Sequence, residues 1–83
     1  MITPTTAADT IRTIRIALRV SQSLLARLSG VSRYKICGCE LGDAVLSRED
    51  RVRIHTAFQT EVERLRRVVI QLDLPIDVEV NGN

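Results

Sequence analysis

Residues 21–42 constrain the fold more than any other part of the chain, because they describe two short helices joined by a tight turn. Ser21 can cap the first helix, and the leucines that follow give it an apolar face at helical spacing. Gly30 supplies the turn, since glycine adopts positive φ without steric cost. Ser32 can then cap the second helix. The pattern predicts helices over about residues 22–29 and 33–40.

The second of these helices begins with Arg33, Tyr34 and Lys35, directly after its cap. Arginine and lysine pair best with guanine in the major groove, and a DNA-reading helix-turn-helix uses the first residues of its second helix for this purpose. The alternative is an ordinary solvated helix face. We interpret these three residues and Ser32 as candidate DNA contacts, with Tyr34 reaching a thymine methyl group or a phosphate.

The segment resembles the lambda-repressor/Cro (Xre-type) helix-turn-helix family, whose common pattern is S-Q-x-x-L-A-x-x-x-G-V-S-x-x-x-I-x-x-x-E-x-G. The matching residues are Ser21, Gln22, Leu25, Ala26, Gly30, Val31, Ser32, Ile36, Glu40 and Gly42. The resemblance covers roughly residues 10–54 and does not extend clearly into the last third of the chain. It implies an all-α, lambda-repressor-like helix-turn-helix bundle that binds duplex DNA.

The resemblance also implies roles for single residues. Gln22 matches a residue that bonds a DNA phosphate at the start of its helix, the alternative being a solvated polar side chain. Arg15 and Glu40 match a buried ion pair that ties the first helix to the end of the third. That pair would be structural, not catalytic.

Two positions depart from the family pattern. Gly38 stands where relatives often carry a long polar base-reading residue, so either that readout is lost or the backbone lies close to DNA. Asp43 stands where relatives often have a basic residue that touches the DNA backbone. Arg48 and Arg51, at the start of the following helix, could compensate for this acid.

Helical periodicity predicts one further helix on each side of this segment. The first would begin after a cap at Thr5 or Thr6 and run to about Val20, with the inner face Ile11, Ile14, Ala17 and Leu18. The last would begin at Ser47, in a sequence that resembles a capping box, and run to about Leu72. A break near residues 55–59 stays open, because the family pattern has two shorter helices there.

An apolar stripe lies along this last helix, with residues spaced by four and three positions. This two-heptad pattern consists of Phe58, Val62, Leu65, Val69 and Leu72. After Pro75, apolar and polar residues alternate as in a strand. A lone strand leaves its backbone groups unpaired, so a second subunit is its simplest partner. The predicted dimerisation residues are Val62, Leu65, Val69, Leu72, Ile76, Val78 and Val80. The alternative is that the stripe merely covers the preceding helices.

Composition limits the function classes. The chain has 83 residues, which we interpret as one domain (1–83) with a helix-turn-helix core at 6–54 and a candidate dimerisation region at 55–83. Residues 1–53 carry nine Lys/Arg against five Asp/Glu, which favours a polyanionic partner for this part. No signal peptide or long apolar run is evident, so we expect a cytoplasmic protein without a membrane segment.

Neither an enzyme nor a metalloprotein is indicated. The spacing of Cys37 and Cys39 suits neither a zinc finger nor a redox motif, and His55 has no evident nucleophile or metal partner. We therefore expect no cofactor and no metal.

The function expected from these observations is sequence-specific binding to duplex DNA by a homodimeric repressor or autoregulator, in the major groove of an inverted repeat. The alternative is a protein-binding module, an antitoxin or anti-activator that retains the fold and grips a co-encoded protein.

Overall fold

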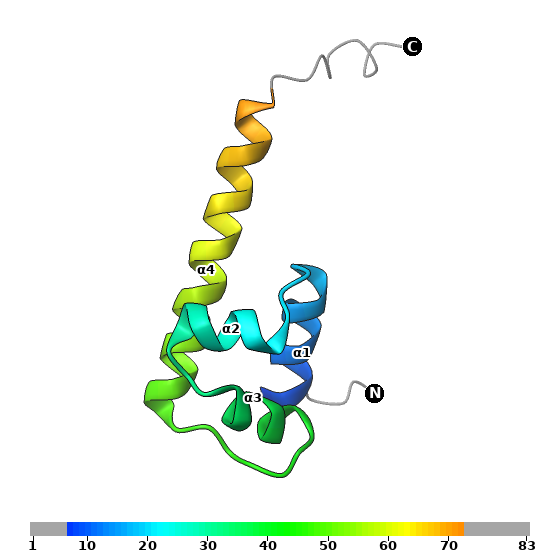
Figure 1. Ribbon diagram of the computed structural model, residues 1–83, viewed down its shortest axis with the longest axis vertical. Helices are drawn as coiled ribbons and strands as arrows, with labels where there is room; N and C mark the ends of the chain where they lie inside the picture. The colour runs from blue at the N-terminus through cyan, green and yellow to red at the C-terminus, as the bar shows by residue number, and fades with distance from the viewer. Residues whose placement is uncertain (1–6, 73–83) are drawn as a thin grey trace, which may run out of the picture.

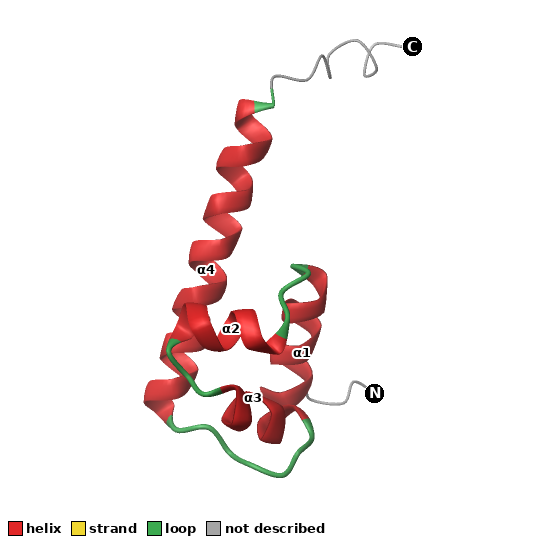
Figure 2. Cartoon of the chain, viewed as in Figure 1, coloured by secondary structure: helices red, strands yellow, loops and turns green. Residues whose placement is uncertain are grey.

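The computed structural model describes residues 7–72 of the chain, and these form four α-helices and no strand (Figures 1 and 2). The helices are α1 (Ala7–Ala17), α2 (Gln22–Ser29), α3 (Arg33–Glu40) and α4 (Arg48–Gln71). The first three and the beginning of α4 pack together, whereas the rest of α4 extends away from them (Figure 1). The strand predicted over 76–80, with Ile76, Val78 and Val80, lies outside the described residues.

The bounds predicted for α2 and α3 are confirmed. Local hydrogen bonds determine where these helices begin. The Ser21 hydroxyl accepts a hydrogen bond from the Leu24 amide at 3.0 Å, and the Ser32 hydroxyl accepts one from the Lys35 amide at 3.1 Å. Each bond satisfies a backbone donor that has no partner within its helix. Gly30 ends α2 with φ at 78°, as the turn requires.

The predicted end of α1 near Val20 is wrong, since the helix stops at Ala17. Arg19 has a positive φ of 58°, and its amide donates to the Ile16 carbonyl while the Val20 amide donates to the Arg15 carbonyl. This is the Schellman arrangement, which glycine normally occupies. Val20 is thereby turned into the core, where it is 3% exposed.

The last helix is continuous, and the possible break near residues 55–59 does not occur. The Ser47 hydroxyl caps α4 by accepting a hydrogen bond from the Asp50 amide at 3.1 Å. At about 1.5 Å per residue its 24 residues extend for about 36 Å. Helices α2 and α3 have only eight residues each, so only part of α4 can contact them.

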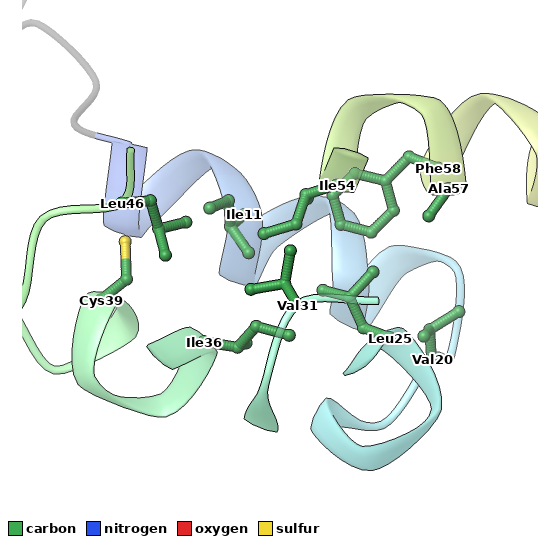
Figure 3. Packing of buried hydrophobic residues seen from close by; sticks show 10 residues of the cluster. All are labelled: Ile11, Val20, Leu25, Val31, Ile36, Cys39, Leu46, Ile54, Ala57 and Phe58. Carbon is green, nitrogen blue, oxygen red and sulfur yellow. The ribbon is translucent and has the colours of Figure 1, made fainter. Parts of the chain in front are cut away.

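Apolar side chains from all four helices meet in one core (Figure 3). Leu25 and Ile36 are its largest fully buried side chains, and Ile14 and Leu18 of the α1 region pack against it. The buried members are Ile11, Val20, Leu25, Val31, Ile36, Cys39, Leu46, Ile54, Ala57 and Phe58. Ala17 was predicted to face inward, but it is exposed.

The apolar stripe of α4 leaves the core after Phe58. Val62, Val69 and Leu72 are 44%, 64% and 53% exposed, and Leu65 is half-buried. The interpretation that this stripe covers the preceding helices therefore holds for Phe58, whereas Val62, Val69 and Leu72 are exposed.

Replacing Arg19 by glycine is expected to stabilise the protein by about 0.5–1 kcal/mol. A non-glycine residue in the left-handed region costs about 1–2 kcal/mol, whereas glycine loses about 0.4–1 kcal/mol more backbone entropy on folding. Urea unfolding measures the difference. Arg12→Gly, in the regular part of α1, is the control and should destabilise by about 1 kcal/mol; equal losses in both variants would contradict the prediction.

Candidate nucleic-acid interface

Helix α3 divides into a buried and an exposed face. Ile36 and Cys39 are 0% and 4% exposed and anchor the helix in the core. Arg33, Tyr34 and Lys35 lie on the outside, and Tyr34 is 90% exposed. The three side chains predicted as base contacts are therefore accessible to a ligand, and they lie at the amino end of a helix that the core holds rigidly.

One of these side chains has a partner that the sequence interpretation missed. The Lys35 ammonium lies 3.3 Å from a carboxylate oxygen of Asp50, in the first turn of α4. The Asp50 side chain is 9% exposed and that of Lys35 is 60% exposed. The sequence that resembles a capping box runs from Ser47 to Asp50, and the sequence interpretation gave this acid no other role. A pairing between α3 and α4 depends on how the two helices pack, and no local pattern signals it.

The contact between Lys35 and Asp50 also shows where Arg48 lies relative to α3. Arg48 is the first residue of α4, two positions before Asp50, and its side chain is exposed. Since Lys35 reaches Asp50, the first turn of α4 lies within the length of one lysine side chain from the first turn of α3. The structure thus brings Ser32, Arg33, Tyr34 and Lys35 to the same end of the molecule as the start of α4 (Figure 1).

Gln22 does not extend freely from the start of α2. Its side-chain nitrogen donates a hydrogen bond to Glu40 Oε1 at 3.1 Å. An amide nitrogen carries two N–H groups, so one donor remains for another acceptor. Ser32 is also engaged, because its hydroxyl oxygen caps α3.

Glu40 is the centre of a polar network that joins α1, α2 and α3. Arg15 Nε donates to Glu40 Oε2 at 2.7 Å, and Arg15 Nη2 donates to Oε1 at 2.9 Å. Arg15 Nη1 also donates to the Val20 carbonyl at 3.1 Å. The expected pair is therefore present in bidentate form, with side chains 15% and 5% exposed, and it includes Gln22 as well.

The network keeps Glu40 ionised. Burial acts to raise the pKa of the Glu40 carboxyl, but hydrogen bonds from Arg15 and Gln22, together with the charges of Arg15 and Arg12, bring this pKa below its ordinary value. The hydrogen bond to Glu40 also raises the pKa of Arg15. Nearby, burial is the main cause of the raised pKa of the Cys39 thiol.

Gly38 has a packing role that the sequence interpretation did not include. It is half-buried, and a Cβ atom added to it would lie 3.1 Å from the Ala44 Cβ. Its carbonyl accepts hydrogen bonds from the amides of Asp43 and Ala44, at 2.8 and 3.1 Å. Glycine thus allows the segment after α3 to fold closely against the helix. Proximity of Gly38 to DNA stays a prediction.

Across residues 7–72 no group of three His, Cys, Asp or Glu side chains is arranged to hold a metal ion, and both cysteines are free thiols. None of the four helices is both long enough and apolar enough to cross a membrane.

Searches of protein-family models, curated proteins and solved structures return no match to this chain.

Replacing Glu40 by glutamine should lower the free energy of unfolding by about 3 kcal/mol, because it leaves the Arg15 guanidinium largely buried without its carboxylate. Thermal or urea unfolding measures the change. The control is Glu63→Gln on the exposed surface of α4, which should change stability by less than about 0.5 kcal/mol. Similar losses in both variants would show that the network contributes no more than a surface charge.

Acid should remove the same contribution. A carboxyl whose pKa is lowered by folding stabilises the protein when ionised, and this stability is lost as the pH falls through its folded-state pKa. The difference in melting temperature between the wild-type protein and Glu40→Gln should therefore be largest near neutral pH and should narrow in acid. A difference that does not depend on pH would contradict this assignment.

Proposed function

We propose that this protein is a sequence-specific DNA-binding regulator of the lambda-repressor-like helix-turn-helix type, in which α2 and α3 form the motif. One observation carries the proposal: Arg33, Tyr34 and Lys35 project from the first turn of α3, while Ile36 and Cys39 anchor the opposite face. A rigid helix with a basic leading edge fits the major groove, which is wide enough to admit one helix.

Arg33 is the main candidate for base recognition. Its guanidinium presents a planar set of donors that matches guanine O6 and N7, and no ion pair within residues 7–72 occupies it. Lys35 would first leave Asp50. Because the Lys35 side chain is 60% exposed, it can turn from Asp50 toward a base or phosphate, and the contact that it makes there would replace the ion pair.

Phosphate contacts would come from residues around this leading edge. Gln22 keeps one amide donor at the start of α2, where the helix dipole favours an anion. Arg48 lies at the start of α4, two residues before the Asp50 that Lys35 contacts. These contacts would orient α3 without reading sequence, and each neutralised phosphate would steepen the dependence of affinity on salt.

The biological activity that fits this chemistry best is repression or autoregulation of transcription by a homodimer on an inverted repeat. Two α3 helices related by a two-fold axis would enter major grooves about 34 Å apart.

The protein-binding alternative has its own support. The segment after α3 exposes two large apolar side chains, Leu41 at 70% and Val45 at 92%. Apolar side chains beside the candidate interface suit a protein surface better than a phosphate backbone. A co-encoded protein that uses this surface would compete with DNA.

The first experiment selects binding sites from a random duplex library and then measures affinity for the selected site by fluorescence anisotropy at two salt concentrations. A selected inverted repeat, bound more tightly than random duplex and with steep salt dependence, supports the proposal. Failure to enrich any sequence, together with weak binding to all duplexes, contradicts it and favours the protein-binding alternative.

Arg33→Ala should weaken binding to the selected site by about 1–3 kcal/mol and should relax one position in each half-site, because one bidentate base contact is lost. Arg67→Ala is the matched control, since Arg67 is an exposed arginine on the half of α4 farthest from α3 (Figure 1). It should leave affinity and specificity unchanged. Equal effects of the two substitutions would exclude base recognition by Arg33.

A further inference from the structure

The second half of α4 exposes more apolar surface than a solvated helix normally carries. Val62, Val68 and Val69 are 44%, 42% and 64% exposed, and Ile70 and Leu72 are 71% and 53% exposed. The apolar core ends at Phe58 on this helix, and Glu61, at 9% exposed, is the last buried residue of α4. Contiguous exposed apolar surface of this kind marks an interaction site.

We propose that this half of α4 pairs in parallel with the same helix of a second copy of the chain. The seam consists of Val62, Leu65, Val69 and Leu72, which occupy alternating a and d positions of a heptad repeat. Valine at both a positions and leucine at both d positions is the combination that favours two parallel strands. The identity of the residues, and not only their spacing, therefore selects a dimer of this orientation.

The flanking charges agree with a parallel pair. With Val62 at position a, Glu61 takes position g and Arg66 takes position e, five residues later. In a parallel coiled coil a g residue lies beside the e residue of the partner helix in the following heptad. Arg66 makes no ion pair within residues 7–72, so it is free to reach the Glu61 carboxylate of the partner. Two such bonds form by symmetry.

The Glu61 side chain is held by its own helix and is 11% exposed. Its carboxylate accepts hydrogen bonds from Arg64 of the same helix at 2.6 and 3.3 Å, and the hydrogen bond from Arg64 lowers the pKa of Glu61. A carboxylate has about four acceptor sites, so Arg66 of a second copy would bind at the small part of Glu61 that stays exposed beside Arg64.

The parallel orientation also suits DNA, a step that rests on the proposed function. Helix α3 lies at the end of the molecule opposite the carboxyl end of α4 (Figure 1). A two-fold axis along a parallel pair places both α3 helices at the same end of the dimer, where one duplex can meet both. An antiparallel pair would place them at opposite ends.

The competing occupant is the segment 73–83 of the same chain, which carries Asp73, Asp77 and Glu79 and could approach the basic α4 residues by charge. A second copy is favoured because the Val/Leu heptad and the Glu61–Arg66 spacing both match a helical partner. Removing residues 73–83 separates the two: if the shortened chain associates more strongly than the full chain, the segment is the occupant and the proposal is wrong.

Sedimentation equilibrium of the full chain without DNA tests the seam. Val69→Glu should raise the dimer dissociation constant at least about tenfold, because it buries a charge in the interface. Ile70→Glu is the matched control: it is the next residue and at least as exposed, but it lies outside the seam. Because both side chains are exposed in one copy, neither substitution should disturb the fold. A monomeric wild-type chain, or equal effects of both substitutions, overturns the proposal.

Orientation is tested by cross-linking. In the full chain with Cys37→Ser and Cys39→Ala, an added Val69→Cys should form an intermolecular disulfide on mild oxidation, because a parallel pair places the two copies of residue 69 side by side. Circular dichroism checks that this background folds; if it does not, mass spectrometry of cross-linked peptides from Val69→Cys with native cysteines gives the same readout. A dimer that forms but does not cross-link at residue 69 overturns the parallel arrangement.

Failure of the α4 pairing can be told apart from failure of the proposed DNA-binding function. Dimerisation is measured by sedimentation without DNA, whereas base recognition is measured with Arg33→Ala. A parallel dimer that selects no DNA sequence would leave the α4 pairing intact and would reject the regulatory function.

Discussion

The bidentate bond between Arg15 and Glu40 is the constraint on which the compact part of the protein depends. It joins α1 to the last residue of α3, and through Gln22 it includes the first residue of α2. The same arginine binds the Val20 carbonyl where the chain turns from α1 toward α2. Three short helices with few aromatic side chains thus receive a fixed relative orientation, because a largely buried charge network tolerates only one geometry.

That orientation determines what the surface can recognise. The fold brings the basic first turn of α3 within reach of the start of α4, where Lys35 contacts the mostly buried Asp50 carboxylate and Arg48 lies two residues before that acid. Lys35 is consequently neutralised by a weak ion pair in the free protein. If the proposed function is correct, DNA exchanges this contact for its own, and the acid moderates binding to arbitrary polyanions.

Local hydrogen bonds set the elements that were predicted correctly, whereas packing between distant segments set those that were not. The bounds of α2 and α3 were predictable because a capping serine and a turn glycine act within four residues of themselves. The end of α1 was not predictable, because Arg19 adopts a strained positive φ that goes together with the burial of Val20. Heptad spacing predicted the stripe of α4, but no periodicity reveals that α1–α3 cover it only as far as Phe58.

The sequence by itself determined the bounds of α2 and α3, the serine caps of α2, α3 and α4, and the basic leading edge of α3, because each follows from short-range chemistry. The pairing of Arg15 with Glu40 was expected from the family resemblance, and the structure contains it. Only the tertiary structure decided that Lys35 meets Asp50, that Gly38 gives room to Ala44, and that α4 extends beyond the core. These features depend on which surfaces meet after the helices have formed, and packing between distant segments leaves no local signal in a single sequence.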